Sequence, residues 1–186
     1  VELHAVTKVS KFKVSYFIVS EDGATVTPYG IPAVYDFGHS VTLLPVPATT
    51  EQYTYSGWYT TEACTTLNAN TFNMPAADVN VYARPTTNKY TVEYYIDGVR
   101  YDAYGVTEVP YGTEYTAKAF PTDITGKEIL SDAWTVIVKN RAITVPSEVA
   151  PNGKITMPAS NLILEATTNN KGYKINYYVT KDGVTT

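Results

Sequence analysis

The sequence predicts a mainly β protein built from two tandem small units, with a strand of a neighbouring unit at each end. The first observation is an opening strand that occurs three times, as KFKVSYFIV at 11–19, KYTVEYYIDG at 89–98 and YKINYYVTKDG at 173–183. The second is a closing segment that occurs twice, as FNMPAADVNVYA at 72–83 and ITMPASNLILEA at 155–166. The third is alternation of period two in these segments, with poor helical periodicity elsewhere.

The positions of these copies predict the domain organisation. Residues 9–86 form the first repeat unit and residues 87–169 the second. Residues 1–8, VELHAVTK, resemble a closing strand and are expected to belong to a preceding unit, while residues 170–186 begin a third. Because a lone strand cannot bury a face, the N-terminal strand of one molecule could complete the C-terminal fragment of the next. Head-to-tail self-association is therefore one expected partner interaction.

The elements of the first unit follow from alternation and turn chemistry. Its opening strand ends at a turn over 20–23, SEDG, and a later strand ends at Pro45, since proline cannot donate to a ladder. In the segment EQYTYSGWYTT the tyrosines share one parity, and Trp58 shares the other with polar residues. Gly57 is a candidate bulge that would break this parity.

The second unit repeats this plan with extra length inside it. Asp97 and Gly98 supply a tight hairpin, and Trp134 shares a face with Val136 and Val138, which predicts a core position. The segments 61–67 and 126–133 are short helix candidates, one in each unit. If they are helical, the units are β-grasp-like; if neither is, they are small β-sandwiches.

Composition excludes several classes of partner. The net charge is -4 with no run of lysine or arginine, so nucleic acid is not expected as a partner. The sequence contains no apolar run near the roughly 20 residues that span a bilayer, so membrane insertion is not expected. Cys64 is the only cysteine, which excludes an internal disulfide.

Catalytic and metal-binding patterns are not found in the sequence. His4 and His39 lie in different units, and none of the common hydrolase, metal or nucleotide motifs is present. Asp22 and Asp97 each precede a glycine, which is ordinary turn chemistry. We therefore expect no enzyme activity, no cofactor and no metal. A glycosidase pair drawn from scattered acids such as Glu62 and Glu128 is the remaining enzymatic alternative.

The aromatic content is higher than small hydrophobic cores usually need. Seventeen Tyr, five Phe and two Trp make up 13% of the chain, and such rings suit contact with sugars or with a protein. Phe17, Tyr95 and Tyr178 occupy the same place in the repeated opening strand, so they form either an exposed ladder or a covered face. The candidate ligand-binding residues are Phe17, Trp58, Tyr59, Tyr95, Tyr101 and Tyr104.

The segments YTYSGWYTT, FNMPAADVNVYA and VPYGTEYTAKAFP resemble the Listeria–Bacteroides, or B-repeat-like, repeats of bacterial cell-surface proteins. The second unit departs from that pattern, with Ala133-Trp134-Thr135 where Gly-Trp-Tyr is expected. The resemblance implies an extracellular, cell-wall-associated and non-catalytic array with β-grasp-like units.

These observations lead to one expected function and three alternatives. We expect an adhesion or binding module at the bacterial cell surface, with an extended polysaccharide as the favoured ligand. The alternatives are a passive spacer, a repeat that binds a host or cell-surface protein, and a glycoside hydrolase.

Overall fold

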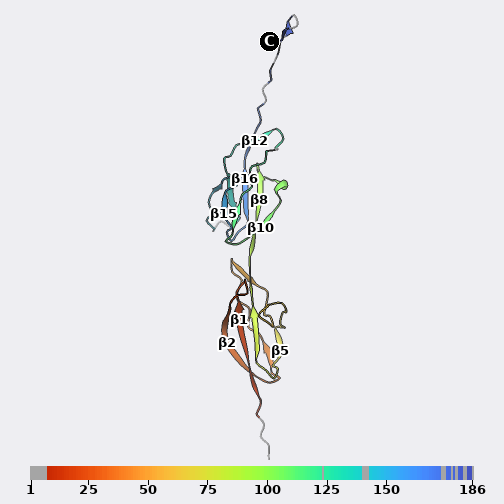
Figure 1. The fold of residues 1–186 in the computed structure, drawn as a ribbon, viewed down its shortest axis with the longest axis vertical. Helices are drawn as coiled ribbons and strands as arrows, with labels where there is room; N and C mark the ends of the chain where they lie inside the picture. The colour runs from red at the N-terminus through yellow and green to blue at the C-terminus, as the bar shows by residue number, and fades with distance from the viewer. Residues whose placement is uncertain are drawn as a thin grey trace, which may run out of the picture. The chain divides into compact units, whose positions relative to one another are not determined.

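The computed structural model describes residues 8–186 except 123, 140–142, 173, 174, 177, 179, 182, 183 and 186. The chain divides into two compact units, Val1–Lys89 and Tyr90–Thr186, each of which is almost entirely β (Figure 1). Residues 1–7 of the predicted terminal strand, which include His4, and most of the third opening strand with its Asp182-Gly183 turn lie outside the described residues. The expected fold class, tandem small β-rich units, is confirmed by the two described units.

Neither helix candidate forms a helix. Thr61–Leu67 is a loop of turns and bends, and the segment 126–133 contains strand β12 (Lys127–Ile129). In the described part of the chain, the single helical element is the 3-10 turn η1 (Asp102–Tyr104). The condition set for the β-grasp-like alternative, a helix in these segments, is therefore not met, which leaves small β-sandwiches as the expected form of the units.

The main sheet of the first unit brings its first and last long strands together. β1 (Lys11–Val19) lies between β2 (Val26–Asp36), which is antiparallel to it, and β6 (Val79–Ala83), which is parallel to it. Two short pairs complete the unit. They are β3 (Ser40–Thr42) with β5 (Thr71–Asn73), and β4 (Tyr53–Tyr55) with β7 (Pro85–Thr87).

The main sheet of the second unit has the same central arrangement. β8 (Lys89–Ile96) and β16 (Leu162–Ala166) pair in parallel, as the first and last strands of the first unit do. The sheet order is β10-β8-β16-β13-β14, with β9 paired to β8. The added strands are β9 (Val99–Arg100), β10 (Thr107–Pro110), β13 (Trp134–Val138) and β14 (Glu148–Val149).

Three further pairs lie in the second half of the chain. β11 (Glu114–Thr116) pairs with β15 (Lys154–Thr156), β12 pairs with β17 (Thr168–Asn170), and β18 (Thr180–Lys181) pairs with β19 (Val184–Thr185). Pairs β11–β15 and β12–β17 have the same antiparallel form as β3–β5 and β4–β7 in the first unit.

Each unit has its own hydrophobic core, and the two methionines occupy matching places in them. Met74 and Met157 are each 1% exposed. The Gly38 N–H donates to the Met74 carbonyl at 2.9 Å, and the Gly112 N–H donates to the Met157 carbonyl at the same distance. Gly38 and Gly112 both have positive φ, 78° and 73°, a conformation that glycine adopts without a steric penalty.

A tyrosine and a tryptophan close each core by holding one backbone residue between them. In the first unit the Leu44 N–H donates to the Tyr16 hydroxyl at 3.3 Å, and the Trp58 Nε1–H donates to the Leu44 carbonyl at 2.6 Å. The two rings meet edge to face with centroids 5.0 Å apart. Both backbone groups of Leu44 are thus satisfied by core side chains, as a strand end beside a core requires.

The second unit repeats this contact with different residues at its centre. The Lys118 N–H donates to the Tyr94 hydroxyl at 2.7 Å, and the Trp134 Nε1–H donates to the Lys118 carbonyl at 2.8 Å. The rings of Tyr94 and Trp134 are 4.8 Å apart, again edge to face. Ala133-Trp134-Thr135 therefore serves the same structural purpose as Gly57-Trp58-Tyr59, although two of the three residues differ. We call this arrangement the Tyr–Trp clasp.

Candidate binding surface

Trp58 lies in the core, so its expected place on the ligand-binding face is wrong. It is 1% exposed, and its indole N–H is used by the clasp. The physical reason is Gly57, whose φ of 155° interrupts the alternation of the segment and turns the next side chain inward. Trp134, expected in the core, is there and has no exposed surface.

Phe17 belongs to an apolar row that crosses the outer face of the first unit. It pairs with Pro28 on β2 and with Tyr82 on β6, and Tyr82 pairs with Tyr59, which in turn pairs with Leu67. Residues directly opposite one another on neighbouring strands point to the same face of a sheet. Pro28, Phe17, Tyr82, Tyr59 and Leu67 therefore lie side by side, and we call them the apolar row.

The rings of the apolar row are only partly open to solvent. The rings of Phe17 and Tyr82 stack with centroids 5.4 Å apart and planes 22° from parallel. Tyr82 is 9% exposed and Phe17 and Tyr59 are half-buried, whereas Leu67 at the end of the row is 57% exposed. Aromatic stacking thus fixes the middle of the row, and apolar surface remains accessible in part at Phe17 and Tyr59 and mostly at Leu67.

The equivalent row in the second unit is mostly polar. Tyr95 pairs with Arg100 and with Glu165, Glu165 pairs with Thr135, and Thr135 pairs with Glu148. Tyr95 is therefore the single aromatic residue among these five positions. The register thus sets Tyr95 among polar and charged neighbours, whereas Phe17 has apolar ones. The expected ladder of Phe17, Tyr95 and Tyr178 stays a prediction.

Tyr95 is held in place by an acid on its own strand. It is half-buried, and its hydroxyl donates to Glu93 Oε2 at 3.3 Å. Glu93 also faces Lys139 Nζ at 3.9 Å. In the third copy of the opening strand, Tyr178 is 68% exposed.

Tyr101 and Tyr104 lie on the core side of the second unit and not beside Tyr95. Their rings meet edge to face at 4.9 Å, and Tyr104 also meets Tyr94 at 5.1 Å. The ammonium of Lys118 sits 4.8 Å from the centre of the Tyr104 ring and donates to the Tyr104 carbonyl at 2.6 Å. Burial raises the pKa of the Tyr104 hydroxyl. Both tyrosines are half-buried, and both pack against the core of this unit.

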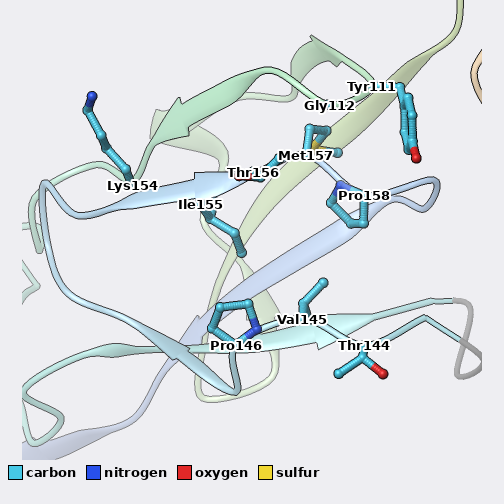
Figure 2. Close-up of a pocket in the computed structure, with 10 residues that line it drawn as sticks. All are labelled: Tyr111, Gly112, Thr144, Val145, Pro146, Lys154, Ile155, Thr156, Met157 and Pro158. Carbon is cyan, nitrogen blue, oxygen red and sulfur yellow. The ribbon is translucent and has the colours of Figure 1, made fainter.

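A groove of about 390 Å³ lies in the second unit between β15 and the segment Thr144–Pro146. Figure 2 shows Ile155 and Val145 pointing into the space between these segments, while Lys154 points away from it. Lys154 Nζ is paired with Glu114 Oε2 at 2.8 Å. Sequence reasoning missed this groove because its wall comes from a longer connection: Met157 follows Trp134 by 23 residues, whereas Met74 follows Trp58 by 16.

The carboxyl groups with shifted pKa values all titrate lower than usual. Hydrogen bonds from Lys127 and Thr168 lower the pKa of Asp97 to about 2, and the hydrogen bond from Lys11 lowers that of Asp36. A general acid at neutral pH needs the opposite shift. Among the described residues, no group of three or more His, Cys, Asp or Glu side chains is arranged to hold a metal ion.

Comparison with known proteins places the first unit in a known class of repeat. Residues 12–84 match the family model of the Listeria-Bacteroides repeat domain, so the resemblance predicted from the sequence is confirmed over the first unit. Listeria–Bacteroides repeats occur in bacterial surface proteins, and residues 12–84 are similar to those repeats.

Two particular proteins are similar to parts of the chain. Internalin H of Listeria monocytogenes is 42% identical over 55 residues, which is 29% of this chain and 10% of that protein. The chain thus spans a small fraction of that relative's length. Streptococcal High Identity Repeats in Tandem (SHIRT) domains 3-4 from a cell surface protein match with a TM-score of 0.28 and 11% identity, covering 86% of this chain and 99% of theirs.

In the described part of the chain, no helix has the length and apolarity needed to cross a bilayer.

Proposed function

We propose that this chain is a non-catalytic extracellular module of a bacterial surface protein that binds an extended polysaccharide along the apolar row. The observation that carries the proposal is the row itself, in which Phe17, Tyr59 and Leu67 keep apolar surface exposed on the outer face of the sheet. The match of residues 12–84 to a surface-protein repeat supports the extracellular location.

The dimensions of the row suit a chain-like ligand better than a compact one. Neighbouring strands lie 4.7–4.9 Å apart, so the four steps from Pro28 to Leu67 span about 19 Å. Sugar rings present apolar C–H surface to aromatic side chains, and each such contact adds about 1 kcal/mol. Several weak contacts along one line then add through the linkage of successive sugars.

Retardation in gels that contain polysaccharide tests this proposal. The double variant Phe17→Ala and Tyr59→Ala is expected to weaken binding by roughly tenfold or more, given two aromatic contacts of about 1 kcal/mol each. The matched control is Tyr95→Ala, which removes the corresponding ring from the polar row of the second unit and is expected to change binding much less. Trp58→Ala is unsuitable because it empties a core position. Equal retardation of wild type and double variant would contradict the proposal.

A passive spacer, or a repeat that binds a protein, is the second candidate function. The burial of Trp58 and the stacking of Phe17 against Tyr82 favour it, because both rings are already used inside the unit. This candidate predicts no retardation on any common polysaccharide. Binding of the row to a host or cell-surface protein would then appear as a surface-plasmon-resonance signal on immobilised host-cell extract that the double variant loses.

Head-to-tail association through the terminal strands remains part of the proposed assembly. It rests on the repeat pattern in the sequence, since residues 1–7 lie outside the described part of the chain. Sedimentation of the 186-residue chain across a wide concentration range tests it. Growth of the sedimentation coefficient with concentration is expected, and a monomer at every concentration would contradict it.

A further inference from the structure

Each unit ends in a short exit strand that has one paired edge and one open edge. In the first unit β7 pairs with β4, and in the second β17 pairs with β12. The other edge of each exit strand presents backbone N–H groups that need a partner. β7 comes directly after the closing strand β6 of the first unit, and β17 comes directly after the closing strand β16 of the second.

In the second unit the open edge is held by Asp97, at the tip of the first hairpin. The Thr168 N–H donates to Asp97 Oδ1 at 2.8 Å, and the Thr168 hydroxyl donates to Asp97 Oδ2 at 2.6 Å. The Lys127 ammonium donates to Asp97 Oδ2 at 2.8 Å. The next N–H on the same edge, that of Asn170, donates to Asn169 Oδ1 at 2.9 Å. The N–H groups of this edge are therefore satisfied by side chains.

In the first unit, Glu21 accepts hydrogen bonds from Thr87 on the open edge of the exit strand. The Thr87 N–H donates to Glu21 Oε1 at 3.0 Å, and the Thr87 hydroxyl donates to Glu21 Oε2 at 2.6 Å. These hydrogen bonds are the main cause of the lowered pKa of Glu21. The contact has the same two-point form as that between Asp97 and Thr168.

Pro85 explains why the acid of the first unit contacts the third residue of its exit strand, whereas the acid of the second unit contacts the first residue. Pro85 pairs with Tyr55 as Thr168 pairs with Ile129, so Pro85 holds the place that Thr168 holds in the second unit. Because proline has no N–H, the first position on the open edge that can donate is two residues further on, at Thr87. Glu21, with one methylene more than aspartate, reaches that position.

We propose that Glu21 and Asp97 are carboxylate clamps that fix each exit strand to its own unit and so slow the local opening of that strand. The two units make the same two-point contact with different acids and at different positions of the exit strand. The contact, and not one particular residue, is therefore the feature that the two units share. A charged acceptor gives shorter and stronger hydrogen bonds than a neutral one. The clamp acts without any ligand and does not depend on the proposed function.

Amide hydrogen exchange of the 186-residue chain, followed by NMR, tests the clamps directly. Asp97→Ala is expected to speed exchange of the Thr168 amide by about tenfold or more, and Glu21→Ala to do the same only for Thr87. The matched control is Asp102→Ala, because Asp102 pairs with Arg100 at the surface. Exchange at Thr87 and Thr168 that stays as slow as in the control would overturn the proposal. The Leu164 amide in the central strand β16 reports whether the unit stays folded.

A milder variant keeps the test decisive where removal of the acid disturbs the whole unit. Thr168→Val preserves the backbone N–H and deletes only the hydroxyl, so the pKa of Asp97 is expected to rise from about 2 toward its ordinary 3.8. An unchanged pKa would overturn the clamp.

Discussion

Removal of one hydroxyl from the second Tyr–Trp clasp is expected to destabilise one unit and leave the other unchanged. The substitution Tyr94→Phe keeps the ring, which packs edge to face on Trp134 at 4.8 Å. It removes the acceptor of the Lys118 N–H and the hydroxyl that meets the Tyr115 hydroxyl at 3.1 Å. Burial raises the pKa of Tyr94 strongly, so the group is a neutral phenol at all ordinary pH values.

The expected loss of stability follows from the Lys118 N–H, which is left without its acceptor. A backbone N–H that loses its acceptor in a partly buried place costs about 1–3 kcal/mol, so we expect the free energy of unfolding of the second unit to fall by about 2 kcal/mol. The corresponding change Tyr16→Phe breaks a longer hydrogen bond, 3.3 Å against 2.7 Å, and is expected to cost about 1 kcal/mol or less in the first unit.

The tryptophans allow the two units to be measured separately in one sample. The chain has two Trp residues, and Trp58 and Trp134 lie in different cores. Fluorine NMR of protein labelled with 5-fluorotryptophan therefore follows each unit through a urea titration. The free energy of unfolding of a small domain falls by about 1 kcal/mol per molar urea. Tyr94→Phe should therefore lower the urea midpoint of the Trp134 signal by about 2 M.

Two results would refute this reasoning. If the Trp58 signal moves as far as the Trp134 signal, the two cores do not unfold independently. If Tyr16→Phe costs more than Tyr94→Phe, the lengths of the two hydrogen bonds do not rank their contributions.

Two further predictions concern a glycine and an acid. Gly57→Ala is expected to destabilise the first unit by about 1 kcal/mol, because its φ of 155° is one that residues with a Cβ rarely adopt; the Trp58 fluorine signal in urea measures it. The pKa of Asp97 is lowered to about 2, so its carboxylate form stabilises the folded state. This contribution to the free energy of unfolding is fully present at pH values above the ordinary pKa of 3.8, and it is lost as the pH falls through 2. NMR titration should show the Asp97 midpoint near 2 and a higher midpoint in Lys127→Ala; a midpoint near 3.8 in the wild type would contradict this.

Alternation along single strands could be predicted from the sequence because it depends on local geometry. Trp134, which shares a face with Val136 and Val138, was expected in the core and lies there. The same rule failed at Trp58, where Gly57 changes the parity, and glycine tolerates that change because it has no Cβ. The rule also could not exclude helix at 126–133, where pairing of β12 with β17 decides the structure.

Contacts between strands could not be predicted from the sequence, because register is set by the whole sheet. Phe17 was expected in either an exposed ladder or a covered face, and its neighbours Tyr82, Tyr59 and Leu67 enter the apolar row only through pairings between strands. The groove beside Ile155 is likewise formed by a connection whose path no local pattern fixes. The clamps share this origin, since Glu21 and Thr87 lie 66 residues apart in the sequence.

The parallel pairing of first and last strands determines how each unit responds to a pull on the chain. β1 and β6 run side by side in the same direction, as do β8 and β16, so the chain enters a unit at one end of this pair and leaves at the other. Tension along the chain then loads the ladder between the two strands in shear, and its hydrogen bonds must break together and not one after another. A repeat with this connection is expected to resist extension through the ladder between its first and last strands.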